Sequence, residues 1–527
     1  MKAFVPRKTR SRLRQISKGP QVTDETTPRT RSSAATWVGF AAMCLGMFMA
    51  ILDVQIVATS LPDIQSALGI APDAMSWVQT AYLIAEVIAI PLTGLLMRAL
   101  SMRWLFVIAT GVFTAASVGC AASQGFNSLI AWRVLQGFAG GTLIPAVFAA
   151  VFLLFPLRQQ AFATTLAGVV AVLAPTVGPI VGGWITSTYS WHWLFLVNVV
   201  PGIVAVALAA GLVPATAANL KEVRRVDWLS LAFMALALAT LEIALKEAPT
   251  RGWLSPLVIG LFAVAVASGS AFVRRSLTHA APIVALRSFA DRRFTIACIL
   301  SFVLGIGLFG STYLMPVFLA FVRDHSALEI GTIMLVTGVA QLVVAPIAVL
   351  AEKRVPARIL TAAGFAFFAV GLGMSVFQTP RTDYDQMFWP QVVRGLAIMF
   401  CLLPPTRMAL GHLTEAEVPD ASGVFNLMRN LGGAIGLALI DTVIYARGPG
   451  HAADLTARLA AGDADAATFI GIPPALLTGG APTPAQQAYL APLMEKAATT
   501  LAINDAWLMM AALTAAALLC IPFARQR

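Results

Sequence analysis

Long apolar runs, separated by short connections of charged and turn-forming residues, follow one another along almost the whole chain. Each run holds roughly 20 apolar residues, the length that a helix needs to cross a bilayer. A closed barrel would show ten-residue alternating strands instead. The predicted spans are 37–61, 75–96, 104–122, 127–149, 161–185, 191–213, 227–246, 255–273, 294–321, 328–351, 358–377, 387–410, 421–445 and 504–523. The pattern therefore predicts an all-α polytopic membrane protein with fourteen transmembrane helices, surrounded by the lipid bilayer.

Composition supports this prediction and excludes other classes. Of the 527 residues, 58% are hydrophobic and only 12% are charged, about half the charged fraction of a soluble domain. The net charge of +11 does not indicate a nucleic-acid partner, because the basic residues fall on alternate connections. Five cysteines lie inside apolar spans without metal-like spacing, so no metal or cofactor is expected. They are Cys44, Cys120, Cys298, Cys401 and Cys520.

The distribution of lysine and arginine predicts the orientation, because cytoplasmic connections carry an excess of both. The tail 1–36 is basic and lacks the apolar core and cleavage site of a secretory signal, so the first helix is expected to be retained. Basic residues recur on every second connection after it: Arg98, Arg103, Arg158, Lys221, Arg224, Arg225, Arg274, Arg275, Arg287, Arg292, Arg293, Lys353, Arg354 and Arg358. Both termini are therefore predicted to be cytoplasmic. The connection from His412 to Asp420 is acidic and departs from this pattern.

One connection is much longer than the others and spans 448–500. It is rich in Ala, Gly, Pro and Asp, and the charge pattern places it on the outer side. A loop of this length is usually either functional or disordered. We expect a partly ordered extracytoplasmic flap here.

Ionisable residues inside the apolar spans are the candidate functional groups, because a charged side chain at the bilayer centre costs about 2.5–3.5 kcal/mol on insertion scales. Asp53 lies roughly 12 Å from the outer end of the first span, and Arg133 lies roughly 9 Å from the outer end of the fourth. The arginine favours the charged carboxylate and removal of water favours the neutral acid, so a conformational change could drive proton uptake and release. The alternatives are a fixed structural ion pair or a residue of an outer vestibule.

Glu86 lies near the midplane of the second span and has no charged neighbour at helical spacing. It is expected either to bind a cationic substrate or carry a proton, or to stay protonated and bonded to a neighbouring helix. A weak internal repeat relates Arg133-Val-Leu-Gln-Gly137 in the fourth span to Gln391-Val-Val-Arg-Gly395 in the twelfth. Arg394 therefore corresponds to Arg133, as duplicated halves of secondary transporters predict.

Glycine and proline are concentrated in the second half of the fifth span. The residues are Pro175, Gly178, Pro179, Gly182 and Gly183. Small residues let helices approach closely, and each proline frees a backbone carbonyl and bends the helix. We interpret this segment as a helix that can rock at a seam between two halves, with generic close packing as the alternative.

Several segments together resemble a known family. They are Leu52-Asp53-Val-Gln-Ile-Val57 ending at Leu61-Pro62, Arg133-Val-Leu-Gln-Gly137, Gly178-Pro179-Ile-Val-Gly182-Gly183, Trp191-His-Trp-Leu-Phe195 with Asn198, Trp389-Pro390-Gln391, and Arg429-Asn-Leu-Gly432-Gly433. In these the chain resembles the fourteen-span EmrB/QacA drug–proton antiporters of the major facilitator superfamily, and the EmrB type most closely. The resemblance covers roughly residues 36 to 523.

That resemblance implies a specific organisation. It implies an N-terminal six-helix bundle over 37–213, two linking transmembrane helices over 227–273, and a C-terminal six-helix bundle over 294–523. It also implies that the first and fourth helices are neighbours, so that Asp53 and Arg133 can pair, and that Arg429 has a role in gating. EmrB-type permeases work in the bacterial inner membrane with a periplasmic adaptor (a membrane fusion protein) and an outer-membrane channel, which the resemblance makes candidate partners.

The chain departs from the family pattern in the connection after the second helix. The family has Gly, then Asp four residues later, and a second Gly three residues further on. Here Gly94 is present, but Arg98 occupies the Asp position and Ser101 the second Gly position. The conformational latch that the resemblance assigns to that Asp is therefore not expected in its usual form.

Taken together, the residues and the resemblance predict a proton-coupled efflux antiporter for amphipathic drugs or toxic compounds. No nucleotide-binding loop, nucleophile elbow or metal cluster is recognisable, so neither ATP-driven pumping nor catalysis is expected. One alternative is a dedicated exporter or importer of a single small molecule, such as a siderophore or an aromatic acid. Another is a receptor or scaffold that does not transport, against which the buried charged residues weigh. The antiport prediction requires the ionisable groups to be reachable from alternating sides of the membrane.

Overall fold

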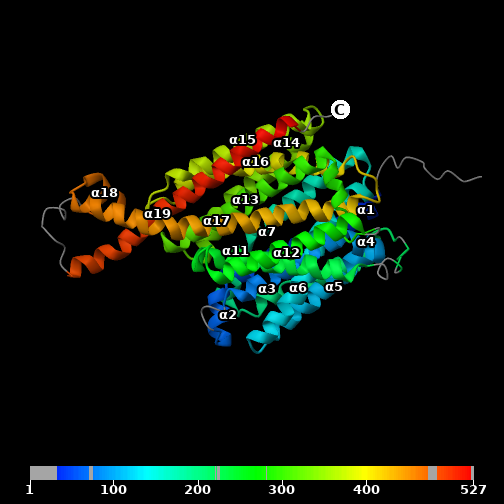
Figure 1. Cartoon of the computed structure of the whole chain (residues 1–527), viewed down its shortest axis with the longest axis horizontal. Helices are drawn as coiled ribbons and strands as arrows, with labels where there is room; N and C mark the ends of the chain where they lie inside the picture. The colour runs from blue at the N-terminus through cyan, green and yellow to red at the C-terminus, as the bar shows by residue number, and fades with distance from the viewer. Residues whose placement is uncertain are drawn as a thin grey trace, which may run out of the picture.

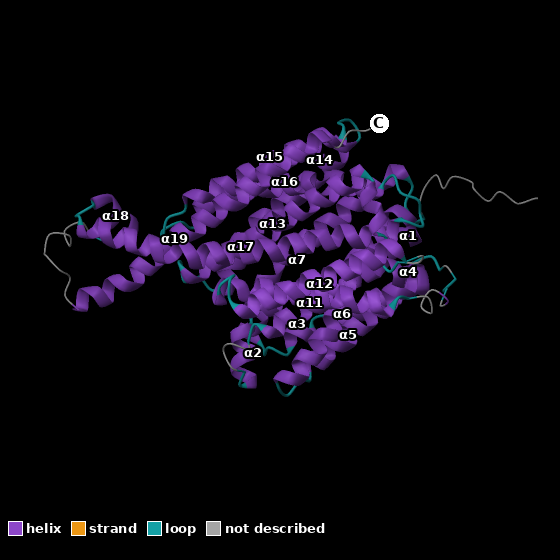
Figure 2. Cartoon of the chain, viewed as in Figure 1, coloured by secondary structure: helices purple, strands orange, loops and turns teal. Residues whose placement is uncertain are grey.

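The computed structural model describes residues 33–70, 75–215, 217–219, 221, 226–279, 282–472 and 484–523. Throughout these ranges the regular structure is helical and contains no strand (Figure 2). Fourteen of the described helical segments are long and apolar enough to cross a membrane. The predicted all-α polytopic architecture is confirmed. The predicted basic tail and the basic residues Arg224 and Arg225 fall outside the described residues, except for the tail's last positions from Ser33.

The helices follow the first twelve predicted spans closely, because apolar length determines where each crossing begins and ends. The first six crossings are α1 (Ala34–Thr59), α3 (Trp77–Ala89) with η1 (Ile90–Leu92) and α4 (Thr93–Leu100), α5 (Met102–Ala121), α6 (Phe126–Leu154), α7 (Leu157–Thr188), and α8 (Trp193–Leu196) with α9 (Val199–Leu212). A short helix, α2 (Leu61–Leu68), follows α1. The two linking crossings are α11 (Trp228–Arg251) and α12 (Pro256–Thr278).

The second series repeats this alternation of long helices and short connections. It comprises η2 (Leu286–Ala290), α13 (Arg292–Phe321), α14 (Ala327–Glu352), α15 (Ala357–Gly373) with η3 (Met374–Phe377), α16 (Tyr384–Leu410), α17 (Val418–Ala460), α18 (Ala464–Ile470), and α19 (Pro484–Ala516) with η5 (Ala517–Phe523). Side chains at the connections define some of these boundaries. Ser326 and Glu329 form a capping box at the start of α14, and Asp383 and Gln386 form another at the start of α16, as such sequence pairs favour.

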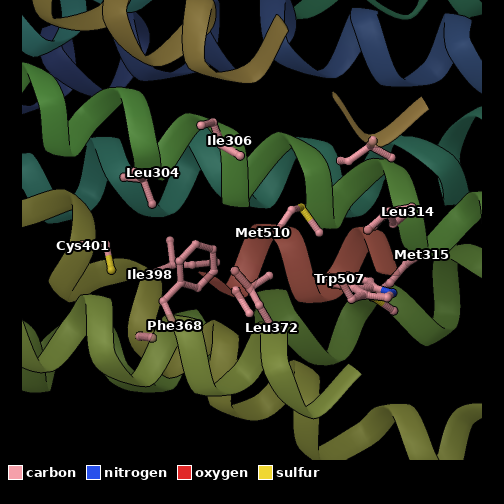
Figure 3. Packing of buried hydrophobic residues seen from close by; sticks show 14 of the residues in the cluster. Leu304, Ile306, Leu314, Met315, Phe368, Leu372, Ile398, Cys401, Trp507 and Met510 are labelled. Atoms are coloured by element: carbon pink, nitrogen blue, oxygen red, sulfur yellow. The ribbon is translucent and has the colours of Figure 1, made fainter. Parts of the chain in front are cut away.

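The crossings pack in two groups. In the first, α3 packs on α6, and α1 packs on α7 and α9. In the second, α13 packs on α17 and α15 packs on α16, around a buried apolar cluster in which α15, α16 and α19 contribute Phe368, Ile398 and Met510 (Figure 3). The linking helices α11 and α12 pack on each other, and α11 also contacts α3 and α17. They therefore lie at the side of the two groups.

One part of the seam between the two groups is formed by α7 against α14, and another by α17 against α6, η1 and α4. Two glycines of α14 allow the close approach: a Cβ at Gly331 would collide with Ile180, and a Cβ at Gly338 would lie 3.1 Å from Thr176. α7 therefore lies at the seam, as predicted for the helix that carries the glycine and proline cluster.

The long direction of the bundle has two distinct ends (Figure 1). At one end lie Arg98, Arg158, Arg275, Arg292 and Lys353, at the termini of their helices; we call it the basic end. At the other end α17, α18 and α19 extend away from the bundle (Figure 1), and we call this extension the projection and this end the projection end.

The projection corrects the expectation of a loop over 448–500. α17 has 43 residues, about 65 Å of helix, and therefore continues well past a hydrocarbon core of about 30 Å. It runs through Gly448 and Pro449, two residues of low helix propensity. Tertiary packing outweighs this low propensity, because Leu455, Ala467 and Ala497 from α17, α18 and α19 share a small buried core.

Candidate functional site

Asp53 lies at the centre of a buried hydrogen-bond network in the first group of helices. Arg133 of α6 donates from Nη1 to Asp53 Oδ2 at 2.5 Å. Gln136 Nε2 and Asn198 Nδ2 each donate to Asp53 Oδ1 at 2.9 Å. The three donors come from α6 and from the start of α9, so the predicted neighbourhood of the first and fourth helices is confirmed. The carboxylate therefore accepts hydrogen bonds from one guanidinium group and two side-chain amides.

Arg133 is held on the other sides as well. Its Nε donates to the backbone oxygen of Val78 at 3.0 Å, and Nη1 also donates to Gln136 Oε1 at 2.7 Å. The guanidinium carbon lies 4.4 Å from the centre of the Tyr82 ring and 5.8 Å from that of Phe195. A guanidinium between two aromatic faces gains cation–π attraction. Its position is therefore determined by several helices at once.

Burial of this network is complete in the observed conformation. Asp53 and Arg133 are both 0% exposed, and every polar partner of the Asp53 carboxylate is a donor. A proton on either oxygen would need an acceptor that this arrangement does not provide, so protonation requires the network to rearrange. This conformation matches the fixed ion pair, one of the alternatives predicted from the sequence. Antiport requires that the Asp53 carboxyl be accessible to water, and this conformation does not provide that access, so antiport would need a second conformation.

Three members of the network were not predicted as site residues, namely Gln136, Asn198 and Ser117. Ser117 of α5 accepts a hydrogen bond from Gln136 Nε2 at 2.8 Å. Each is a polar residue inside an apolar span, which was the available signal. Gln136 and Asn198 also belong to the segments that carry the family resemblance.

Glu86 of α3 differs from Asp53 in its surroundings. It is 8% exposed, and its carboxyl makes no hydrogen bond or ion pair within the described ranges. Its backbone packs against Gly141 of α6, and α3 also packs on α11, which carries a second acid, Glu242. Two acids thus lie on adjacent helices, one in the first group and one in a linking helix.

Arg394 of α16 is the counterpart of Arg133 in the second group. It is 2% exposed, and its Nη1 and Nη2 donate to Ser375 Oγ at 3.1 Å and to Met315 Sδ at 2.9 Å. The guanidinium carbon lies 4.7 Å from the centre of the Trp507 ring. The two repeat-related arginines are therefore both buried and both in contact with an aromatic ring. They differ in that the contacts of Arg394 are all with neutral groups.

The two groups of helices meet at the basic end through the start of α17. Ser422 donates to the backbone oxygen of Pro145 at 2.8 Å. Arg429 is 7% exposed, donates to Asn426 Oδ1, and lies with its guanidinium carbon 5.1 Å from the centre of the Phe148 ring of α6. The candidate gating arginine thus contacts both groups where they close against each other.

The unexpected charges at Arg98 and Asp420 also belong to this closure. Arg98, in the last turn of α4, forms an ion pair with Asp420, in the first turn of α17. Gly94 packs directly against Asp420, where a Cβ would collide with it. The acid that the family pattern carries on the second helix is therefore replaced by an arginine whose acidic partner lies on the opposite group.

The glycine and proline cluster of α7 contacts both groups. A Cβ at Gly178 would collide with Gln55 of α1. Pro175 lines a small cavity of about 20 Å³ at the seam, together with Arg394. Pro179 and Gly182 are buried, and Gly183 is partly buried. The cluster therefore lies between α1 and the seam.

Comparison with known proteins agrees with these features. A family model described as Major Facilitator Superfamily matches residues 43–437. The colistin resistance protein EmrB of Acinetobacter baumannii is 40% identical over 77% of this chain and 80% of its own length. The multidrug export protein EmrB of Escherichia coli K12 is 31% identical over 79% of this chain and 81% of its own.

A solved structure shares the fold. The crystal structure of the human organic anion transporter MFSD10 superposes with a TM-score of 0.58 at 13% sequence identity, and covers 91% of this chain and 99% of that one. Fourteen apolar crossings within the described residues, two of them linking helices beside two packed groups, are those of a multi-pass membrane transporter, and the chain belongs to the major facilitator superfamily. Within that superfamily it is of the EmrB type.

Proposed function

We propose that this protein is a proton-driven exporter of amphipathic drugs or other toxic compounds. The export of drugs is supported by the similarity to the two EmrB proteins, whose names record colistin resistance and multidrug export. The observation that carries proton coupling is a carboxylate, Asp53, buried at membrane depth against a single cation. Such groups are rare inside membranes and mark ion or substrate pathways.

The protein acts in the bacterial cytoplasmic membrane with its basic end in the cytoplasm. Cytoplasmic connections carry an excess of Lys and Arg, and the helix termini at this end carry Arg98, Arg158 and Arg275. Both chain termini then lie in the cytoplasm and the projection lies outside. Two transporting bundles, 37–213 and 294–523, are joined by the linking helices over 227–273, with 448–500 as the outward part.

Asp53 exchanges its proton in a conformation other than the one observed. In the observed state, with the basic end closed, the carboxylate is sealed by Arg133, Gln136 and Asn198. Movement of α1 relative to α6 separates the pair and exposes the acid to one side, where it takes up or releases a proton. Glu86 is the second candidate, because it is slightly exposed and has no hydrogen-bond partner in the described part of the chain.

The test uses purified protein in liposomes under an imposed pH gradient, with an amphipathic cationic dye as substrate. Dye-dependent proton movement should be present in the wild type and absent in Asp53→Asn. Asp441→Asn is the matched control, because it makes the same change at another membrane acid, one that accepts a hydrogen bond from Tyr313 at 2.8 Å. Retained coupling in Asp53→Asn with loss in Glu86→Gln assigns the proton to Glu86. Retained coupling in both variants refutes a role for these acids.

The projection supplies a surface for a periplasmic adaptor that leads to an outer-membrane channel. This proposal is supported by its length, since α17 extends roughly 30 Å beyond a hydrocarbon core, and by its own buried core around Leu455. A photo-crosslinking residue at exposed Thr456 should capture a protein with one membrane anchor in cells. The same residue at exposed Trp193, on the projection end of the first group, should not.

A further inference from the structure

Arg394 is a buried cation without an acidic partner in the part of the chain that the structure describes. Its partners are a serine hydroxyl, a thioether and an indole ring, from Ser375, Met315 and Trp507. Within the described residues no carboxylate lies within ion-pair distance of it. A thioether sulfur is a weak acceptor, and a buried charge without a counter-charge is costly. An anion bound beside the guanidinium would remove this cost.

Comparison with the first group shows what is missing. At Arg133 the helix that opens the group, α1, provides Asp53. At Arg394 the helix that opens the second group, α13, provides Met315 instead. Met315 and Trp507 lie next to each other at one end of the apolar cluster of the second group (Figure 3). The repeat thus keeps the arginine and its aromatic neighbour but not the acid.

A cavity opens directly beside this cation. It has a volume of about 190 Å³ and lies between η3 and the first turns of α16, near the projection end. Its polar lining includes Ser375, Gln378 and Gln386, and its two charged lining residues are Arg394 and Arg381. Arg381 is exposed, so the cavity reaches the surface. No acid is among the residues that line it.

The acid that caps α16 beside this cavity is already engaged. Asp383, at the start of α16, accepts from Arg323 Nη2 at 2.7 Å and contacts the His325 ring at 3.1 Å. It also caps α16 through the backbone nitrogen of Tyr384. Asp383 is therefore not available to neutralise Arg394, and the positive charge of the cavity is left for a ligand.

We propose that this cavity binds a small monocarboxylate, whose carboxylate group pairs with the Arg394 guanidinium. A cavity of about 150 Å³ is enough to hold benzene, so the observed volume fits an acid of benzoate size. Guanidinium and carboxylate form short charge-assisted hydrogen bonds, often two in parallel, and these would replace the weak bond to Met315. The site is separate from the Asp53 network and does not depend on proton-coupled export.

The experiment measures the unfolding temperature of the purified full chain against benzoate concentration, with benzamide as the neutral analogue. A ligand that binds only the folded protein raises this temperature in proportion to its affinity. Benzoate should stabilise the wild type and benzamide should not. Arg394→Gln should lose the response to benzoate completely.

A second variant keeps the test decisive if Arg394→Gln does not fold. Gln386→Glu adds a negative charge to the cavity wall, and Glu serves as well as Gln in the capping box that this residue forms with Asp383. It should weaken benzoate binding at least threefold. Asn127→Glu makes the same charge change in the first turn of α6, the repeat-related helix, and should bind as the wild type does.

The proposal is overturned by equal stabilisation with benzamide, or by a benzoate response that survives in Arg394→Gln. Unchanged affinity in Gln386→Glu overturns it as well. None of these results affects the proposal of proton-driven export, because that proposal is tested at Asp53 and Glu86.

Discussion

The ion pair between Arg98 and Asp420 should hold the basic end closed, and neutralising it should increase the population that is open there. In Asp420→Asn the arginine loses its charged partner while the shape of the side chain is retained. The pair is partly buried, with side chains 31% and 13% exposed. An exposed pair contributes 0–1 kcal/mol and a hydrogen bond to a charged group about 1.5–3 kcal/mol. We therefore expect Asp420→Asn to lower the free energy of opening at the basic end by about 1–2 kcal/mol. This corresponds to a 5–30-fold change in the ratio of the open to the closed state.

Thiol labelling measures this ratio. Ala421 is 1% exposed, so a cysteine placed there reacts with a polar maleimide only when the basic end opens. The labelling rate of Ala421→Cys should rise 5–30-fold when combined with Asp420→Asn. Asp385→Asn is the control, because it makes the same change at an exposed acid in the first turn of α16, and it should leave the rate unchanged.

The reversed pair provides a second check. Arg98 lies in the last turn of α4 and Asp420 in the first turn of α17, so each charge also suits the dipole of its own helix. Exchanging the two residues restores their mutual attraction but opposes each dipole, at about 0.3–1 kcal/mol apiece. The exchange should therefore recover only part of the closure.

A labelling rate of Ala421→Cys that changes less than twofold when Asp420→Asn is added would refute the reasoning.

Three further predictions concern separate contacts. Burial alone would raise the pKa of Asp227, but hydrogen bonds from the first turn of α11 and from Arg275 outweigh burial and lower the pKa to about 2. The stability that this contact contributes is therefore fully present above the ordinary pKa of 3.8 and is lost as the pH falls towards 2. Melting curves of the wild type should show this loss of stability between pH 3.8 and pH 2, and those of Asp227→Asn should not. Gly178→Val should abolish dye efflux in cells at normal expression, because its side chain collides with Gln55, whereas Gly111→Val, with open space around it, should not. Gly94→Ala should speed labelling at the basic end as the loss of the ion pair does, because it forces α4 away from α17.

The crossings could be predicted from the sequence because the bilayer imposes one simple requirement, an apolar helix of sufficient length. Sequence reasoning failed at the projection, where no bilayer constrains the chain. There a long segment rich in Ala, Gly, Pro and Asp favoured a loop, but the helix continues because distant segments pack against Leu455. Such tertiary contacts leave no local signal.

The charged residues show the same division. Depth along each helix placed Asp53 and Arg133 at similar levels, and their pairing followed once the two helices were taken as neighbours. Arg98 and Asp420 were each noticed as exceptions, but no periodic pattern relates residues that are more than 300 positions apart. Their pairing depends on how the two groups meet. The missing counter-charge at Arg394 likewise became visible only with its neighbours in three dimensions.

α17 joins the closure at the basic end to the projection in one continuous helix, from Val418 to Ala460. A rod of about 65 Å that tilts by about 5° moves its tip by about 6 Å. Each cycle of opening and closing would thus swing the tip like a lever. The position of the tip would therefore depend on which side of the carrier is open. A protein bound to the tip would respond to that state without contacting the transported compound.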